Sequence, residues 1–393
     1  MLSDVQRVVL IKTGKFRKRL EKHLHIISLD VPYPVNYGGV FDLFYKLPAL
    51  QQQGVKIHLH CFDSGRGEQD ELNKYCVSVD YYKRLKGHQG ISTSLPYIVA
   101  TRNSTRLLDN LLLDDHPVFM EGVHCTYPLN DERFKERKFF VRQHNVEHIY
   151  YRQLYETTSS FTKKAYYWWE SKMLYDYEKQ IVNKATFWGV SHKDVSEYQM
   201  LGCKNIDFLP LYLPEWKVKG ALGKGDFCLY HGNLSVGENE KAASWLLEEV
   251  FANLEIPFVV AGKDPARKLK VLAHSKPHTC LVENPSEKEM QNLISKAHIH
   301  VLPSFNATGM KLKLVNALFN GRHCLVNSAA AEGSGLENAC YVADTAEAMQ
   351  TVITQLYNQP FSVEDLDDRH RVLDNMFDNT ANAKQMVKWI WGE

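Results

Sequence analysis

Residues 298–328, HIHVLPSFNATGMKLKLVNALFNGRHCLVNS, decide the fold. The apolar run 299–302 is too short for a helix and is followed by Pro-Ser, which is typical of a buried strand. From residue 310 to 320 apolar side chains recur at helical spacing, and Gly321 ends the predicted helix before another short apolar run. A strand, a glycine-bearing loop, a helix and a second strand indicate one unit of a parallel α/β sheet.

The loop of this stretch and the first turn of its helix have the features of an anion site. Gly309 leaves room for a ligand to approach the backbone closely, and Asn306 or Thr308 can cap the helix. Free N–H groups and the positive end of the helix dipole point toward the same edge. Lys311 and Lys313 are unfavourable for the helix itself here, so they indicate a partner of opposite charge, for instance a diphosphate. Solvated surface lysines explain the pattern equally well at this point.

The composition narrows the class of protein. A chain of 393 residues is long enough for two or three domains, and 47 basic against 46 acidic residues give no case for a nucleic-acid binder. The sequence lacks a run of about eighteen apolar residues, so no membrane span is predicted. The eight cysteines are scattered without a CxxC pair, which indicates buried free thiols in a reducing compartment and neither disulfides nor a zinc site.

A second glycine loop lies near the start of the chain. Residues 23–29 predict a strand, Gly38 and Gly39 precede a helix over 40–53, and residues 55–62 alternate as the next strand. This order indicates a parallel βαβ unit. The two glycines would let a phosphate approach the backbone at a helix start, although a simple turn would use them as well.

Polar side chains follow two further predicted strands. The strand over 117–120 ends just before His124, and the strand over 139–141 delivers RQHNVEH, residues 142–148, to the same edge. Open α/β sheets bind their ligands at the C-terminal ends of their strands. The crowding of polar residues therefore predicts a site, whereas a single loop histidine is more often only solvated.

Residues 149–182 predict one long helical stretch that is rich in tyrosine, tryptophan and lysine. Its aromatic residues Tyr166, Trp168, Trp169 and Tyr175 are expected to form the core face of that helix. A surface at a membrane interface, or one that stacks on sugars, is the alternative interpretation.

Two segments differ in composition from the predicted strands and helices. Residues 1–22 place an apolar run before a cluster of lysines and arginines, the reverse of a signal peptide. They are expected to be a frayed basic extension, with a basic arm that touches anionic lipid as the alternative. Residues 207–225 contain two prolines and three glycines, which predicts the boundary between two domains.

Taken together, these features resemble the retaining GT-B glycosyltransferases. In the donor-binding segment of that family, a strand ending in Pro-Ser precedes a Glu-Gly loop, a helix containing Glu-Ala, a glycine and a second strand. Thr308 and Asn316 stand where the family usually has its two glutamates, and the Gly-x-Lys-x-Lys pattern of 309–313 is similar to a subset of the family. The residues that match in order and spacing are Pro303, Ser304, Gly309, Ala317 and Gly321.

The resemblance covers nearly the whole chain from about residue 23. It implies that the Gly-Gly loop faces the donor across a cleft and that His124 contacts the transferred sugar. Residues 144–147 look like a segment of a bacterial sugar-transferase subset, so either His124 or Glu147 is expected to orient the acceptor hydroxyl. The resemblance also implies that transfer needs no strong enzyme base, because the leaving phosphate can take the proton.

The chain departs from the family at two charged positions. Much of the family has an arginine and, five residues later, a lysine for the donor diphosphate, whereas this chain has Asn233 after Gly232 and then Glu238. Lysine binds phosphate as a point charge, so lysines elsewhere can substitute. Glu283, at a strand end, is expected to approach the base or ribose, or else to be a solvated carboxylate. The substitute lysines are Lys263, Lys311 and Lys313.

The fold class that this resemblance implies is α/β, of the GT-B type, with two Rossmann-like domains whose parallel sheets face each other across a cleft. Residues 23–206 are expected to form the acceptor domain, 207–375 the nucleotide-sugar donor domain, and 376–393 a helix that packs back on the first domain. The predicted reaction moves a sugar from a nucleoside-diphosphate sugar to a glycan, a lipid-linked saccharide or another glycoconjugate, with retention. No metal ion, no other cofactor and no nucleic acid is expected to take part.

The predicted setting is surface polysaccharide or glycoconjugate synthesis in the cytoplasm, with possible peripheral contact at the inner face of the membrane. A catalytically weakened GT-B protein that binds a nucleotide or partner is the alternative, and an epimerase or phosphorylase is a third possibility. The predicted catalytic residues are His124 and Glu147. The predicted donor-binding residues are Gly38, Gly39, Gly232, Asn233, Lys263, Glu283, Thr308, Gly309, Met310, Lys311, Lys313 and Asn316. The predicted acceptor-binding residues are Arg142, His144 and Asn145.

Overall fold

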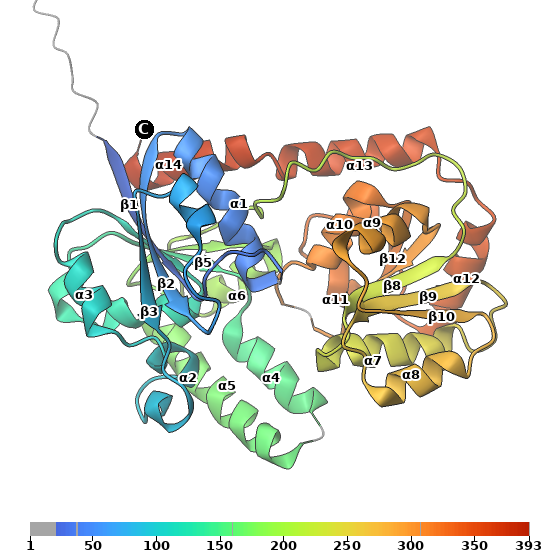
Figure 1. Cartoon of the computed structure of the whole chain (residues 1–393), viewed down its shortest axis with the longest axis horizontal. Helices are drawn as coiled ribbons and strands as arrows, with labels where there is room; N and C mark the ends of the chain where they lie inside the picture. Colours follow the sequence, from blue (N-terminus) through green and yellow to red (C-terminus); the bar gives the residue numbers. More distant parts are fainter. Residues whose placement is uncertain (1–20, 37, 159, 307, 393) are drawn as a thin grey trace, which may run out of the picture.

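The protein folds into two α/β domains placed side by side, as Figure 1 shows for the computed structural model. The structure describes residues 21–36, 38–158, 160–306 and 308–392. Most of the basic extension predicted over 1–22 therefore lies outside the described residues. Both sheets pair only in parallel, which confirms the prediction of two Rossmann-like domains.

The first domain contains a seven-stranded sheet in the order β3-β2-β1-β4-β5-β6-β7. Its strands are β1 (Lys22–Ser28), β2 (Val55–Asp63), β3 (Ser78–Lys83), β4 (Val118–Glu121), β5 (Phe139–Gln143), β6 (Thr186–Gly189) and β7 (Ile206–Phe208). Its helices are α1 (Gly38–Gln52), α2 (Tyr97–Ala100), α3 (Thr105–Leu111), α4 (Glu147–Thr157), α5 (Phe161–Ile181) and α6 (His192–Met200). Because β7 belongs to this sheet, the first domain extends beyond residue 206.

The second domain contains a six-stranded sheet in the order β10-β9-β8-β11-β12-β13. Its strands are β8 (Cys228–Asn233), β9 (Phe258–Lys263), β10 (Thr279–Glu283), β11 (Ile299–Val301), β12 (His323–Val326) and β13 (Tyr341–Val342). Its helices are α7 (Gly237–Trp245), α8 (Arg267–His274), α9 (Glu287–Lys296), α10 (Leu312–Asn320), α11 (Ser328–Ala331) and α12 (Ala346–Tyr357). The deciding stretch of the sequence thus forms β11, the loop over residues 302–311, α10 and β12. This loop is called the donor loop below, after its predicted role.

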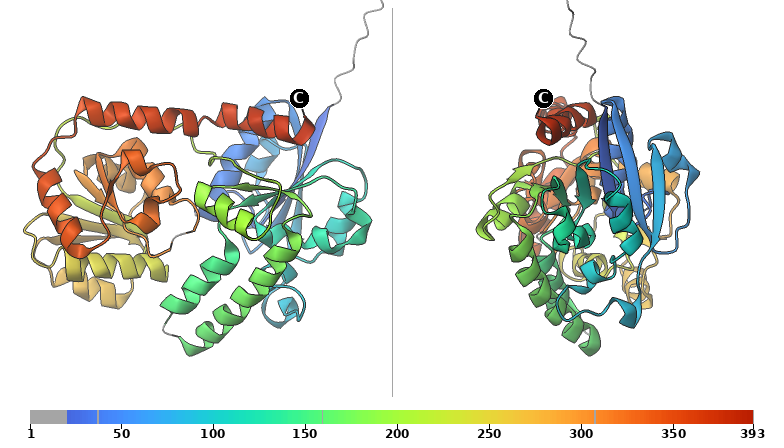
Figure 2. Two further views of the ribbon diagram at one scale, coloured as in Figure 1. Left: turned by 180° about the vertical axis from the view of Figure 1, so that it is seen from behind. Right: turned by 90° about the vertical axis from the view of Figure 1, so that its left-hand side faces the viewer.

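Two final helices, α13 (Val363–Met376) and α14 (Asn379–Trp391), run along one side of both domains (Figure 2). The last of them packs against α1 and adds Met386 and Ile390 to the apolar core of the first domain. Trp389 stacks on Trp188 of β6 with ring centroids 5.4 Å apart. The end of the chain therefore returns to the domain in which the described part begins.

The core of each domain lies between its sheet and the surrounding helices. All four residues of β4, and all four of β12, are buried, as expected for strands of a parallel sheet that is covered on both faces. All eight cysteines are free thiols, and five of them are buried. Among the described residues, no helix combines the length and the apolar character needed to cross a bilayer.

The long helix predicted over 149–182 is in fact an antiparallel pair, α4 and α5, which packs together as a hairpin. The prediction that its aromatic residues form a core face is wrong, because Trp168 is 45% exposed and Trp169 is 54% exposed. Glu170 and Glu178 point inward instead, where they accept hydrogen bonds from backbone N–H groups at the starts of α2 and α4. The inner face of α5 therefore carries carboxylates that cap two neighbouring helices, and the aromatic residues predicted for that face are exposed.

A row of histidines crosses one face of the first sheet. Nδ1 of His23 lies 2.9 Å from Nε2 of His58, and Nδ1 of His25 lies 2.8 Å from Nε2 of His60. Nε2 of His25 also lies 3.0 Å from a carboxylate oxygen of Asp114. Burial lowers the pKa of His25 to about 4 and that of His60 to about 3, so both rings are neutral near pH 7.

Acid is expected to destabilise the first domain through this row. A histidine whose pKa is lowered in the folded state contributes stability above its unfolded pKa of about 6.5, and this contribution is lost as the pH falls toward 4. For His25 the loss is on the order of 3 kcal/mol. Urea unfolding at about pH 7 and about pH 4.5 should show a smaller loss for His25→Gln than for the unmodified chain. His274→Gln, on exposed α8, should keep the full loss; equal losses in all three proteins would contradict the prediction.

Candidate active site

The two predicted glycine loops face each other across the gap between the domains. Helix α1 begins at Gly38 and α10 begins at Leu312, and a side chain added at Gly38 would contact Cδ1 of Leu312 at 3.4 Å. Gly38 is exposed and Gly39 is half-buried. Since each helix start carries free N–H groups and the positive end of the dipole, both domains direct positive potential at the same place.

The donor loop is held by its own polar side chains. Oδ1 of Asn306 accepts hydrogen bonds from the N–H and the hydroxyl of Thr308, both at 2.9 Å. The hydroxyl of Ser304 accepts from the N–H of Asn306 and lies 2.6 Å from Oε1 of Glu238 on α7. The buried Thr308, which replaces the first glutamate of the family, therefore stabilises the loop.

Lys311 and Lys313 are both directed into the protein at the start of α10. Nζ of Lys311 donates to the carbonyl oxygen of Thr308 at 2.6 Å. Nζ of Lys313 donates to Oδ1 of Asn239 at 2.9 Å and lies 4.7 Å from the centre of the Tyr230 ring. Burial lowers the pKa of both lysines, to about 8 for Lys313, while the nearby carboxylate of Glu238 partly opposes the shift. The interpretation of these lysines as solvated surface residues is therefore wrong.

Asp194 of α6 reaches the donor loop from the first domain. Its Oδ1 accepts from the N–H of Gly309 at 3.3 Å, and its Oδ2 accepts from the hydroxyl of Ser191 at 2.7 Å. Gly309 has φ +68, and a Cβ there would lie 2.4 Å from Oδ1 of Asn145 and from the carbonyl oxygen of His144. Only glycine fits between these groups. The N–H that was expected to face a phosphate is thus bonded to a carboxylate in this structure.

His124 and Glu147, the two predicted catalytic residues, come together. His124 lies just past β4 and Glu147 is the first residue of α4, and Nδ1 of His124 is 3.9 Å from Oε1 of Glu147. Nδ1 of His124 has no hydrogen-bond partner among the described residues. Burial, and next the charge of Arg102, hold the pKa of His124 well below its usual range. The imidazole is therefore neutral.

Glu147 is a neutral carboxylic acid near pH 7. Burial, and next the charge of Glu178, raise its pKa to about 8. Glu178 is fixed there because it accepts hydrogen bonds from the N–H groups of Glu147 and His148, both at 3.1 Å, and from the hydroxyl of Tyr198 at 2.6 Å. The pair of His124 and Glu147 can therefore position hydroxyl groups of a sugar without carrying charge.

Replacing Glu147 by glutamine is expected to make the fold more stable at alkaline pH. A carboxyl group whose pKa is raised in the folded state contributes stability below its unfolded pKa of about 4.3, and this is lost as the pH rises through about 8. Glutamine does not titrate. Between about pH 5 and about pH 9, the free energy of unfolding of Glu147→Gln should therefore rise by on the order of 3 kcal/mol relative to that of the unmodified chain. Urea unfolding measures the difference, and Glu156→Gln, exposed on the same helix, should show none.

The prediction that Arg142 binds the acceptor is wrong. Its side chain is fully buried, and its Nε donates to Oδ2 of Asp42 at 3.0 Å. Its other nitrogens donate to the carbonyl oxygens of Leu209 and Pro210. Arg142 therefore ties β5 to α1 and to the segment that leaves the first domain, and it does not reach the gap.

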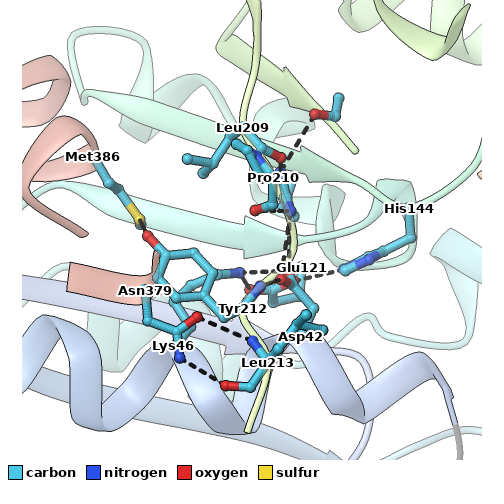
Figure 3. A network of polar contacts seen from close by, with 12 residues as sticks. Asp42, Lys46, Glu121, His144, Leu209, Pro210, Tyr212, Leu213, Asn379 and Met386 are labelled. Carbon is cyan, nitrogen blue, oxygen red and sulfur yellow. Dashed lines mark hydrogen bonds and ion pairs between the residues drawn. The ribbon is translucent and has the colours of Figure 1, made fainter. Parts of the chain in front are cut away.

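Figure 3 shows how this buried network extends to His144. Nζ of Lys46 lies 3.0 Å from Oδ2 of Asp42 and 2.5 Å from Oε1 of Glu121, and Nε2 of His144 lies 2.8 Å from Oε2 of Glu121. Although burial alone would raise it, the charges of Arg142 and Lys46 hold the pKa of Asp42 well below its usual range. Asp42, Glu121 and His144 have the spacing of metal ligands, but Lys46 already places a cation between the two carboxylates.

The other predicted donor residues are spread along the strand ends. Lys263, at the end of β9, is exposed beside Asn233 of β8. Glu283 at the end of β10 forms an ion pair with Lys270, 2.5 Å apart, so its carboxylate is already engaged. Oδ1 of Asn316 accepts from Asn320 one turn further along α10. Gly232 and Met310 are half-buried, on β8 and in the donor loop.

Asp194 and Glu238 are the residues that sequence reasoning missed. In the sequence Glu238 stands where the family usually has a lysine, and in the structure its carboxylate accepts from Ser304 and its charge partly opposes the lowered pKa of Lys311 and Lys313. Asp194 follows Ser191 by three residues at the end of a strand, and this Ser-x-x-Asp spacing is a helix-capping signature. That signature predicts the position of Asp194 at the start of a helix, but not its contact with the other domain.

Sequence comparisons show which known proteins this chain is similar to. Residues 225–359 match the glycosyl transferases group 1 family. A protein of Klebsiella pneumoniae, described as an uncharacterized 44.6 kDa protein in the cps region, is 25% identical over 331 residues, which are 79% of this chain and 84% of the relative.

The solved structures that resemble this one include GT-B glycosyltransferases. HepE of Anabaena, in complex with UDP and glucose, covers 95% of this chain and 100% of its own, with TM-score 0.65 and 9% identity. A glycosyltransferase from Rickettsia africae covers 94% and 99%, with TM-score 0.61 and 13% identity. WaaG, a glycosyltransferase involved in lipopolysaccharide biosynthesis, covers 94% and 100%, with TM-score 0.62 and 13% identity. At these identities the likeness shows the fold alone, which is that of GT-B proteins, while the second domain, residues 225–359, matches the glycosyl transferases group 1 family.

Proposed function

We propose that this enzyme transfers a sugar from a nucleoside-diphosphate sugar to a saccharide acceptor, with retention at the anomeric carbon and without a metal ion. The observation that carries the proposal is the pair of half-buried lysines, Lys311 and Lys313, at the start of α10, opposite the start of α1. A diphosphate bound there would receive charge-assisted hydrogen bonds and the dipoles of two helices. This is the stabilisation that a leaving diphosphate needs.

In the proposed reaction, the bond from the anomeric carbon to the diphosphate oxygen breaks as the bond to the acceptor oxygen forms on the same face. The acceptor proton passes to the leaving phosphate, so no strong enzyme base is required. His124, neutral and partly exposed, positions the sugar, and the carboxylic acid of Glu147 beside it donates a hydrogen bond. Asn145 and His144 lie on the first-domain side of the donor loop, where an acceptor would enter.

Two relatives support a role in the synthesis of surface polysaccharide. The relative from Klebsiella pneumoniae is named for the cps region, and WaaG is described as acting in lipopolysaccharide biosynthesis. We therefore propose a glycan or lipid-linked saccharide as the acceptor, used at the cytoplasmic side of the membrane. Contact between the basic extension and anionic lipid stays a prediction, since residues 1–20 lie outside the described part.

Thermal unfolding with nucleoside diphosphates and nucleotide sugars tests the donor site. A ligand at about 100 times its dissociation constant should stabilise the fold by ~2.7 kcal/mol. UDP is the first to test, because the Anabaena structure contains it. A shift of the unfolding transition with one nucleotide would support the donor site. Transfer of the corresponding sugar, with NMR spectra that show the configuration at the anomeric carbon retained, would support the proposed reaction. If no nucleotide shifts the transition, the proposed donor site is wrong.

A further inference from the structure

The α4–α5 hairpin of the first domain carries a pocket of about 550 Å³ between its two helices. Three aromatic side chains line it: Tyr155 from α4, and Trp168 and Tyr175 from α5. Trp168 and Tyr175 are each close to half exposed, and the core face of α5 is formed by other residues. Both rings therefore leave part of their aromatic surface open to a ligand. Exposed aromatic surface of this kind marks a site of interaction.

The pocket is separate from the candidate active site. Neither His124 nor Glu147 lines the pocket, and Tyr150 of α4 does not line it either. Arg152, which lines the pocket, follows Tyr150 by two residues and therefore projects from the opposite side of α4. A ligand in the pocket would bind to the hairpin without entering the gap between the domains.

The charges around the pocket are balanced. Arg152 and Lys172 supply two cations, and Glu156 and Asp176 supply two carboxylates. Nε of Arg152 lies 3.3 Å from Oε1 of Glu156, and Nζ of Lys172 lies 3.9 Å from the centre of the Trp168 ring. Anionic lipid or phosphate would gain little from such a site, because the carboxylates oppose the attraction of the cations.

We infer that this pocket is a second saccharide-binding site, which holds a part of a glycan that is not undergoing transfer. A pyranose ring offers an apolar C–H face together with a rim of hydroxyl groups that both donate and accept hydrogen bonds. The pocket offers aromatic rings beside ammonium, guanidinium and carboxylate groups, and its volume lies within the range of about 300–1,000 Å³ typical of ligand sites. The inference rests on the proposed function only in that the acceptor is a saccharide.

Two neighbouring tryptophans provide the test. Trp168 and Trp169 are both exposed on α5, but only Trp168 lines the pocket, so Trp168→Ala and Trp169→Ala form a matched pair. The full chain and both variants are applied to an array of neutral and acidic bacterial oligosaccharides, without donor. We expect the full chain and Trp169→Ala to bind, and Trp168→Ala to lose at least 10-fold in affinity. Thermal unfolding with a nucleoside diphosphate should shift equally in all three proteins, so a failure of the donor site would be seen separately.

Vesicles of phosphatidylethanolamine with phosphatidylglycerol serve as the competing partner. The exposed aromatic residues of α5 would favour a membrane surface if Trp168→Ala, Trp169→Ala and Phe161→Ala all weakened vesicle binding while no saccharide bound. That result, or equal saccharide binding by Trp168→Ala and Trp169→Ala, would overturn the inference. Loss of saccharide binding by Trp168→Ala alone, at an unchanged melting temperature, would establish it.

Discussion

Replacing Lys311 and Lys313 together by alanine is expected to reduce sugar transfer at least about 100-fold, which corresponds to removing roughly 3 kcal/mol of transition-state stabilisation. The negative charge on the diphosphate increases as its bond to the sugar breaks, so groups that bind it contribute more to the transition state than to substrate binding. The two lysines are half-buried, and burial lowers the pKa of both, so water screens their charge less than it would screen an exposed lysine.

Steady-state kinetics with a saturating donor measures this effect, because the loss should appear in kcat as well as in KM. Lys268→Ala provides the control, since this lysine is exposed on α8 of the same domain. The ammonium of Lys313 is bonded to Asn239, so Lys313→Met with Lys311→Met tests whether packing alone matters. Turnover that is unchanged in the double variant would contradict the assignment of these residues to the diphosphate.

Replacing Arg142 by methionine is expected to lower the free energy of unfolding by about 3–5 kcal/mol. The substitution removes a guanidinium that is bonded to Asp42 and to the carbonyl oxygen of Leu209, both buried, and to the carbonyl oxygen of half-buried Pro210. Asp42 would keep only Lys46 as a charged partner, and Lys46 must also neutralise Glu121. One cation would then face two buried carboxylates.

Urea unfolding followed by circular dichroism measures the loss. Arg133→Met is the control: Arg133 also binds a carboxylate, 2.6 Å away on Asp131, but it is exposed, so water screens the pair and its loss should change stability little. Arg142→Lys should show an intermediate loss of stability, because lysine keeps the positive charge but lacks the several N–H donors of the guanidinium. A loss for Arg142→Met as small as that for Arg133→Met would mean that the buried network contributes little to stability.

The parallel α/β fold could be predicted from the sequence because its signals are local. Residues 298–328 specify strand, loop, helix and strand by apolar spacing and glycine position, and the structure has these elements within two residues of the prediction. The break between α4 and α5 could not be found in this way, since the helical pattern continues on both sides of it. Glu170 and Glu178 turn inward for partners that lie far away in the sequence, and no periodicity shows that.

The site could be predicted only in part, for a similar reason. Lys311, Lys313 and Gly309 belong to one short segment, and their joint position follows from the helix start. The contact of Asp194 with Gly309 joins residues of two domains, and the role of Arg142 depends on a segment that returns past β5. A polar residue at a strand end can either face a ligand or anchor the neighbouring chain, and only the three-dimensional arrangement distinguishes the two.

The return of α14 to the first domain determines when that domain can be completed during synthesis of the chain. Its residues Ala383, Met386, Val387 and Ile390 belong to the same apolar cluster as Leu24 and Ile26 of β1. When a ribosome has synthesised the first domain, these side chains do not yet exist, and that cluster stays open on one side. Domains often fold as units during synthesis, N-terminal first. Here the first of the two described domains is completed only after the second domain and α14 have been synthesised.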